Sequence, residues 1–234
     1  KCTGMIVPPR QPYSGELVFT AFSGSHQDAI RKGLKAKREI WNIPYLTIDP
    51  QDIGRRYDMI RVNGQSGKGG IAYLLENGCG INLPKDMIRE FGIVAGKMID
   101  SMVREVTSTD LREMLWREYI DQNGKYRLVS VNSVDGDSGC KCSSVIEYEG
   151  SEHQLFGEGN GPVDAFVRSL QISGVADVAV VDQAEHALAE GAEASAIAYI
   201  KLKFSDGSIC WGAGVDTNVS HASVRAVISA LNRE

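Results

Sequence analysis

The strongest constraint on the fold is a pattern that occurs twice in the carboxyl-terminal half of the chain. In each copy, three strand-like runs separated by turn dipeptides such as Asp135-Gly136 and Asp206-Gly207 precede one amphipathic helical run. An offset of 57 residues, from Ala165 to Ala222, superimposes the helical runs and the glycine turns before them. A repeat this short indicates one duplicated domain. We predict an α+β domain of two βββα repeats with pseudo-twofold symmetry, which favours an isologous dimer.

The elements of this domain are predicted from the spacing of apolar residues and from turn signals. Strands are predicted at residues 126–134, 140–148, 152–156, 176–188, 195–204 and 208–213, and helices at 163–170 and 219–231. The turn from Gly157 to Phe166 contains three glycines, an asparagine and a proline. The helix start within it leaves backbone N–H groups that can hold a carboxylate, and the alternative is a plain strand-to-helix turn.

Ahead of this domain the sequence is mostly helical in character. Residues 1–15 are rich in proline and glycine and indicate an irregular opening segment. Helices are predicted at 16–22, at 26–34 with Ser23 or Ser25 as the cap, at 51–57 with Asp49 as the cap, from 71 onward, at 85–103 and at 111–120. The glycines between residues 61 and 70 lack the spacing of a phosphate-binding loop and predict a helix start instead. Helical spacing stops at Asn123-Gly124, where we expect a domain boundary.

Charge and cysteine content exclude several classes of protein. The net charge of −5 and the lack of a Lys/Arg block argue against nucleic-acid binding. No apolar run approaches the roughly 20 residues of a membrane span. Cys140 and Cys142 share a strand face but lack a second Cys/His pair, so we expect no metal site and reduced thiols in a cytoplasmic protein. Because the chain opens at Lys1 without a methionine or signal peptide, we expect a segment of a longer protein.

Several segments together resemble the carboxyl-terminal part of the 2-isopropylmalate synthase family. The matching segments are Pro12–Ile30, Pro44–Pro50, Arg61–Tyr73, Gly157–Pro162, Glu185–Ala187 and Trp211–Gly214, in family order. The resemblance implies an acyltransferase that condenses acetyl-CoA with 2-oxoisovalerate in leucine biosynthesis, in an amino-terminal TIM barrel with a divalent metal (Mg²⁺, Mn²⁺ or Zn²⁺). The barrel's HxH motif is absent from this chain. We therefore expect that the chain alone is inactive.

The same resemblance implies a domain order and two catalytic residues. Residues 1–15 would end the catalytic region, 16–60 and 61–123 would form linker subdomains I and II, and 124–234 would form the regulatory, dimer-forming domain. His26 and Tyr45 would reach the active site of the partner subunit in a homodimer. Histidine is readily poised for proton transfer near neutral pH. The alternative for each residue is an ordinary capping or packing role.

The regulatory domain of the family binds leucine as a feedback inhibitor. Carried over by motif, the effector site comprises Gly159, Asn160, Gly161, Pro162 and Ala165 from the first repeat, and Val180, Ala187, Ala194, Ala196 and Val215 from the second. Such small residues leave space for a branched aliphatic side chain beside backbone N–H groups. This chain has Gln183-Ala184 where the family commonly has aromatic residues. We expect this change to weaken leucine binding or to alter the choice of effector.

Three other interpretations remain open. A citramalate or homocitrate synthase relative would use isoleucine or lysine as effector. A stand-alone amino-acid-binding dimerisation module would have no catalytic part, and an upstream barrel sequence would exclude it. If the Gly157 turn is only a fold feature, a bulky residue in place of Gly161 should reduce stability without abolishing an effector response.

Overall fold

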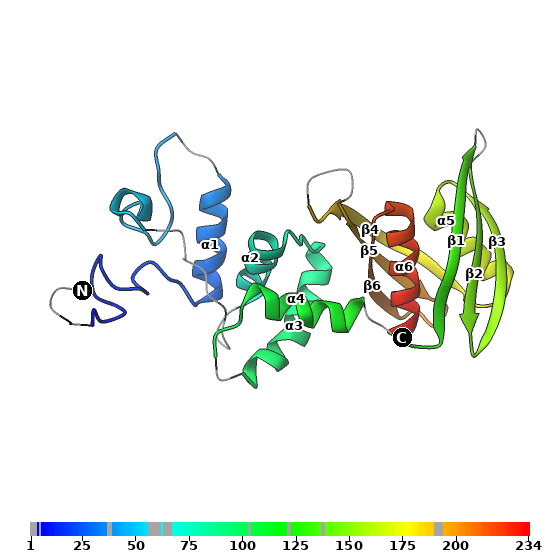
Figure 1. Cartoon of the computed structure of the whole chain (residues 1–234), viewed down its shortest axis with the longest axis horizontal. Coiled ribbons are helices and arrows are strands. Elements are labelled where there is room, and N and C mark those ends of the chain that lie inside the picture. Colours follow the sequence, from blue (N-terminus) through cyan, green and yellow to red (C-terminus); the bar gives the residue numbers. More distant parts are fainter. Residues whose placement is uncertain are drawn as a thin grey trace. The chain divides into compact units, whose positions relative to one another are not determined.

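The computed structural model describes residues 4, 6–36, 39–55, 62, 67–102, 104–120, 123–136, 139–189 and 194–234 of the chain. The chain forms two compact units, whose elements are labelled in Figure 1. Unit 1 comprises Lys1–Ile81 and Ile88–Arg112, and unit 2 comprises Asn82–Met87 and Glu113–Glu234. The duplicated sequence lies in unit 2. The domain boundaries expected after residues 15, 60 and 123 stay predictions.

Unit 1 is built from helices and turns. It contains α1 (Gly24–Lys35), the 3-10 helix η1 (Pro50–Ile53), α2 (Lys68–Cys79), most of α3 (Lys85–Asp100) and the first residues of α4 (Ser108–Tyr119). Helices α1 and α2 contact each other, and Ile30, Ile71 and Leu75 are buried. The start of α2 at Lys68 confirms the helix start that the glycine-rich stretch predicts, although residues 63–66 lie outside the described part.

The prediction of a helix at residues 16–22 is wrong, because this segment forms turns. The N–H of Leu17 donates to the carbonyl of Pro9 at 2.7 Å, whereas a helix would pair it with a carbonyl four residues before. The guanidinium of Arg55 donates to the carbonyl of Gly15 at 2.8 Å. These long-range bonds use the backbone groups that a helix would have paired locally.

The cap predictions in unit 1 have different outcomes. Asp49 Oδ1 accepts from the N–H of Gln51 at 2.9 Å, which confirms Asp49 as a cap. The helix it opens is only the single 3-10 turn η1, because Gly54 follows in the left-handed region with φ 72°. Ser23 is the N-cap residue of α1 by position, but its side chain makes no capping hydrogen bond.

Unit 2 contains the predicted βββα pattern twice. The first repeat consists of β1 (Tyr126–Gly136), β2 (Gly139–Tyr148), β3 (Ser151–Gly159) and α5 (Pro162–Ile172); the second consists of β4 (Val178–Ala187), β5 (Ala196–Phe204), β6 (Ile209–Asp216) and α6 (Val219–Asn232). Each repeat forms an antiparallel three-stranded sheet in sequence order. The α+β fold class and the two βββα repeats are therefore confirmed.

The two repeats also share their irregularities. The register of β1 with β2 shifts between Leu128 and Ser130, and that of β4 with β5 shifts between Val180 and Asp182. A shift at the same place in each first strand is a local bulge, which reverses the face to which the following side chains point. The pseudo-twofold symmetry thus extends to the details of strand pairing.

The core of unit 2 is shared between both sheets and both helices. Helix α5 packs on β2 and β3 of its own repeat and contacts β4 of the other, while α6 packs on β5 and β6 and contacts β1. Figure 1 shows α6 between the strands of the two sheets. The buried cluster accordingly includes Ile146 and Phe166 of the first repeat and Ile200 and Val227 of the second. Neither repeat encloses its core alone.

Equivalent glycines allow each helix to rest directly on strand backbone. A Cβ atom at Gly157 would lie 2.2 Å from the carbonyl oxygen of Ala165, and one at Gly214 would lie 2.2 Å from that of Ala222. Both pairs are related by the 57-residue offset of the repeat (157 to 214, 165 to 222). In contrast, a Cβ at Gly161 would meet nothing within 4 Å. The helix seating therefore requires glycine at Gly157 and Gly214, and Gly161 is free of that requirement.

This difference generates a prediction about stability. Gly157→Ala or Gly214→Ala should destabilise unit 2 by about 1–3 kcal/mol or more, because a helix must move away from its strand. Each kcal/mol should lower the melting temperature by about 3–5 °C in a unit of this size. Gly161→Ala is the matched control and should cost less, about 1 kcal/mol or below, because it only replaces the N-cap glycine of α5. Thermal unfolding followed by circular dichroism measures all three, and equal melting temperatures would contradict the seating argument.

Candidate functional site

The two predicted catalytic residues lie together in unit 1. His26 is exposed in the first turn of α1, and Tyr45 is exposed in the turn after Pro44. Their ring centroids are 4.1 Å apart, with an angle of 31° between the ring planes. The structure thus brings together two side chains whose proximity is not evident from their positions in the sequence. Their catalytic role stays a proposal.

Tyr45 is held in an unusual backbone conformation. Its φ is 68°, in the left-handed region that a tyrosine rarely adopts. The N–H of Leu46 donates to the carbonyl of Ile43 at 3.2 Å, so Pro44 and Tyr45 are the central residues of a β-turn. Proline is favoured at the first of these positions, and some turns require positive φ at the second. Strained residues of this kind persist only when their surroundings hold them, and they are common at functional sites.

The turn is anchored on helix α1. Ile43 is buried and forms a small apolar cluster with Ile30 of α1. A Cβ atom at Gly33 of α1 would lie only 2.7 Å from Pro44 Cδ, so glycine allows the turn to approach the helix. The same contacts that support the strained turn therefore direct the ring of Tyr45, which is 64% exposed, toward His26.

Unit 2 contains a cleft at the starts of its two helices, which we call the helix-start cleft. It has a volume of about 380 Å³, and its walls come from the starts of α5 and α6 and from β4. The lining residues are Asn160, Gly161, Pro162, Val163, Asp164, Gln183, Glu185, Val219, Ser220 and Ser223. The glycine turn of the sequence thus forms one wall of a cleft that both repeats contribute to.

The two helix starts that meet in this cleft differ in their capping. Asn218 Oδ1 caps α6 by accepting from the N–H of Ser220 at 2.8 Å and from that of His221 at 3.3 Å. Helix α5 begins after Gly161, whose lack of a side chain leaves it without a side-chain cap. Backbone N–H groups and the helix dipole at such a start favour an anion. The start of α5 is therefore the better seat for a carboxylate.

Two carboxylates also line the helix-start cleft. Asp164 is engaged locally, since its Oδ2 accepts from the N–H of Asn160 at 2.9 Å and its Oδ1 from Arg168 Nε at 3.0 Å. Glu185 Oε2 accepts from the hydroxyl of Ser223 at 3.3 Å. No lysine or arginine belongs to the described lining. This combination suits a ligand that carries both a carboxylate and an ammonium group.

The other predicted effector residues are distributed around this cleft. Val180 lines an adjoining cleft of about 310 Å³ between α5 and β4, the α5–β4 cleft, which shares Gln183 with the helix-start cleft. Gly159 lines a smaller cleft of about 210 Å³. Ala165 is buried in the core, Ala187 pairs with Ala196 across β4 and β5, Ala194 precedes β5, and Val215 lines a separate cleft beside α6. The structure groups Asn160, Gly161 and Pro162 with Gln183.

Sequence reasoning did not select Glu185 and Ser223 as lining residues. Glu185 lies two residues after Gln183 on the same strand, beyond the bulge, so both side chains face the same side of the sheet. This alternation could have shown that Glu185 faces the same side as Gln183. It could not show which side, because the bulge after Val180 reverses the faces of the residues that follow. The other histidines have structural partners: His153 lies near Tyr148, His186 accepts from Asn82 N–H, and His221 lies near Asp216.

Among the described residues, no group of three or more His, Cys, Asp or Glu side chains is arranged to hold a metal ion. No described helix is both long enough and apolar enough to span a membrane.

Comparisons with known proteins match both parts of the chain. The family described as alpha-isopropylmalate synthase, post-catalytic domain-like, matches residues 16–76. The family described as LeuA allosteric (dimerisation) domain matches residues 105–234. These ranges include His26 and Tyr45 in the first match and the helix-start cleft in the second.

Curated relatives match along almost the whole chain. Proteins named 2-isopropylmalate synthase from Parafrankia sp. (strain EAN1pec) and Ralstonia pickettii are 44% and 45% identical to it over 99% of its length. One from Pseudomonas syringae pv. syringae is 44% identical over 100% of the chain. The chain spans 42% of the length of each of these relatives.

The ring contact between His26 and Tyr45 can be tested directly by NMR. Tyr45→Ala should remove the shielding that the tyrosine ring imposes on the His26 ring protons and move their resonances downfield. Tyr45→Phe keeps the ring and should preserve the shift. His153, which neighbours Tyr148 in unit 2, is an internal control that should not change. Identical His26 resonances in Tyr45→Ala and the parent chain would refute the contact.

Proposed function

The chain belongs to the 2-isopropylmalate synthase family, and we propose that it forms the carboxyl-terminal part of an enzyme that condenses acetyl-CoA with 2-oxoisovalerate in leucine biosynthesis. The observation that carries this proposal is the pair of family matches, one to a post-catalytic domain and one to an allosteric domain, in this order on one chain. Acetyl-CoA, the keto acid and the divalent metal would bind to a barrel outside this chain. The present residues would complete and regulate that active site.

Unit 1 would complete the active site of the partner subunit in a homodimer. His26 and Tyr45 are exposed and adjacent. His26 belongs to α1, and Tyr45 lies on a turn that packs against α1 at Gly33. An imidazole and a phenol in contact can donate a proton to a substrate oxygen or accept one from it. Such general acid–base catalysis commonly raises the rate by about 10²–10⁴-fold. The strained backbone at Tyr45 supports a functional role, because residues in such conformations are common at functional sites.

Unit 2 would bind leucine in the helix-start cleft as a feedback inhibitor. The uncapped start of α5 would hold the carboxylate, and Glu185 would hold the ammonium group. Val163, Val219 and, in the adjoining cleft, Val180 offer apolar surface for a branched side chain. If leucine changes the affinity for substrate by some factor, substrate must change the affinity for leucine by the same factor, because coupling between two binding sites is reciprocal.

Gln183 makes an amino acid other than leucine a second candidate for the effector. Its amide is polar and exposed, and it lines both the helix-start cleft and the α5–β4 cleft. A polar wall discriminates less strongly for leucine than an aromatic wall does. Isoleucine or lysine would take the place of leucine if the protein is a citramalate or homocitrate synthase relative.

Mixed dimers of the full-length enzyme test the catalytic role of unit 1. His26→Ala in one subunit type and a change in the barrel's metal-binding HxH motif in the other should each lower kcat by about 10²-fold or more when alone. A mixture of the two should recover part of the activity, because some active sites then combine an intact barrel with an intact His26. A mixture as inactive as its components would show that His26 does not act across the subunit interface.

Leucine binding tests the role of unit 2. Calorimetry on the chain should detect leucine at up to millimolar concentration. Gly161→Leu should abolish this binding and the inhibition of the full-length enzyme while leaving kcat and the melting temperature close to those of the parent, because a side chain there enters open space. The closest matched change is Gly161→Ala, which should retain weakened binding. Unchanged inhibition in Gly161→Leu would remove the helix-start cleft from consideration.

The effector itself is identified by the same titration. Heat with isoleucine or lysine, and none with leucine, would replace leucine as the effector while keeping the site. Glu185→Gln should weaken every amino acid ligand by about tenfold, since a hydrogen bond to a charged group contributes about 1.5–3 kcal/mol. Glu158→Gln, on an exposed position of β3, is the control for the loss of one negative charge.

A further inference from the structure

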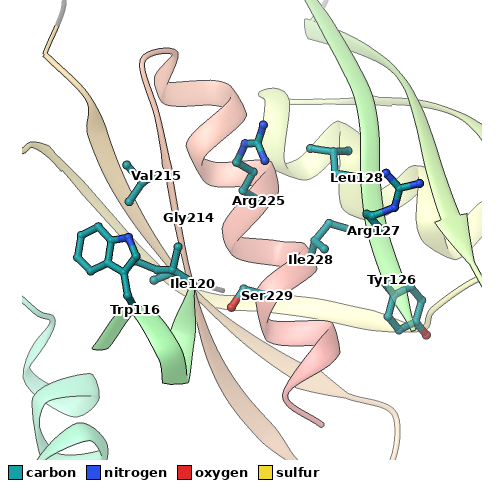
Figure 2. Close-up of a pocket in the computed structure, with 11 residues that line it drawn as sticks. Trp116, Ile120, Tyr126, Arg127, Leu128, Gly214, Val215, Arg225, Ile228 and Ser229 are labelled. Atoms are coloured by element: carbon teal, nitrogen blue, oxygen red, sulfur yellow. The ribbon is translucent and has the colours of Figure 1, made fainter. Parts of the chain in front are cut away.

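Another cleft of unit 2 lies between α6 and β1, and we call it the α6–β1 cleft. Its volume is about 360 Å³. Figure 2 shows α6 as the floor, with Leu128 and Tyr126 of β1 on one side. On the other side lie Val215 of β6, Trp116 of α4 and Ile120, which directly follows α4. These side walls are apolar or aromatic. Among the residues predicted to bind leucine, only Val215 belongs to its described lining, and the proposed leucine site is the helix-start cleft.

One cationic group lies at one end of the α6–β1 cleft. In Figure 2 the guanidinium of Arg225 extends from α6 between Val215 and Leu128. Its Nε donates to Asp216 Oδ2 at 3.0 Å, so the carboxylate orients the group without itself lining the cleft. This ion pair engages Nε, and the two Nη atoms form an edge that arginine uses for bidentate contacts with carboxylates. Arg127 also lines the cleft, but its guanidinium pairs with Glu147.

The state of Asp216 supports this arrangement. Burial by itself favours the protonated acid, but the N–H of Asn218 and the guanidinium of Arg225 donate to the carboxylate, and together they hold the pKa of Asp216 below its ordinary value. Asp216 is therefore ionised at neutral pH and keeps Arg225 in place.

We propose that the α6–β1 cleft binds a small monocarboxylic acid with a branched or aromatic apolar body and no ammonium group. The carboxylate would pair with Arg225, and the body would lie against Ile228, Leu128 and Tyr126. No aspartate or glutamate belongs to the described lining of this cleft, so an ammonium group would find no counter-charge there. The helix-start cleft has the opposite composition, with two carboxylates and no cation in its described lining. The charges thus assign amino acids to one cleft and their ammonium-free analogues to the other.

The pseudo-twofold symmetry provides an internal comparison. The α5–β4 cleft is the counterpart of the α6–β1 cleft, and Arg168 occupies the position of Arg225 (168 plus the offset of 57 is 225). Arg168 Nε pairs at 3.0 Å with Asp164, which itself lines that cleft. Val178 and Val180 stand where the α6–β1 cleft has Tyr126 and Leu128. The α5–β4 cleft therefore has an equivalent arginine, but an aspartate lines it and it has no aromatic side chain in its described lining.

The probe for this proposal is 4-methylpentanoate, which has the carbon skeleton of leucine without its ammonium group. Titration of the ¹⁵N-labelled chain, followed by NMR, should shift the amides of Ile228 and Ser229 and the indole N–H of Trp116 at millimolar probe. Arg225→Gln should weaken binding by about tenfold or more, because it removes a charge-assisted bidentate contact. Arg168→Gln is the matched control and should bind like the parent.

The controls decide between the proposal and its alternatives. Leucine itself should leave the α6–β1 resonances unchanged. If the spectrum shows that Arg225→Gln is not folded, Arg225→Lys replaces it as the test variant. Lysine keeps a positive charge beside Asp216 but lacks the planar two-donor edge of arginine, so the proposal predicts that Arg225→Lys binds the probe more weakly than the parent. The proposal is overturned by absent shifts at millimolar probe, by shifts confined to Asn160 and Gly161, or by equal affinity in folded Arg225 variants and the parent.

Discussion

The close contact between helix backbone and strand backbone at two equivalent glycines supports the whole of unit 2. Gly157 and Gly214 allow α5 and α6 to rest on β3 and β6 with no side chain between them. Because each helix packs so closely on its own sheet, it also contacts the first strand of the other repeat. The buried side chains of both sheets therefore form one core. The repeats depend on each other for burial, which explains why the duplicated pattern forms a single unit.

The same seating creates the clefts. Short connections after β3 and β6 bring the starts of α5 and α6 to a common cleft, and β4 closes it with Gln183 and Glu185. Where each helix meets the first strand of the other repeat, a further cleft remains. The symmetry sets where these clefts lie, while substitutions that differ between the repeats set their charge. A capped and an uncapped helix start, and acidic and basic linings, therefore coexist in one small duplicated fold.

Unit 1 uses a different physical device for its candidate site. A β-turn with Pro44 and Tyr45 at its centre directs the chain back onto α1. Contacts at Gly33 and Ile43 hold this turn in place. The strain at Tyr45 is maintained by this anchorage rather than by any property of tyrosine. Precise placement of an exposed ring next to His26 is thus a consequence of buried neighbours, which is the usual way in which a surface site is made rigid.

Sequence by itself determined the elements of unit 2, their βββα order, their duplication and the family, because apolar periodicity and turn residues act over a few neighbours and are repeated. It also selected His26, Tyr45 and the glycine turn as candidate site residues through motifs, and their roles stay proposals. It wrongly predicted a helix at residues 16–22, because backbone groups there form hydrogen bonds with Pro9 and Arg55, which are distant in the sequence. Only the tertiary structure decided that Glu185 and Ser223 line the helix-start cleft and that Arg225 lines the α6–β1 cleft. Those outcomes depend on a bulge and on contacts between distant elements, which no local pattern encodes.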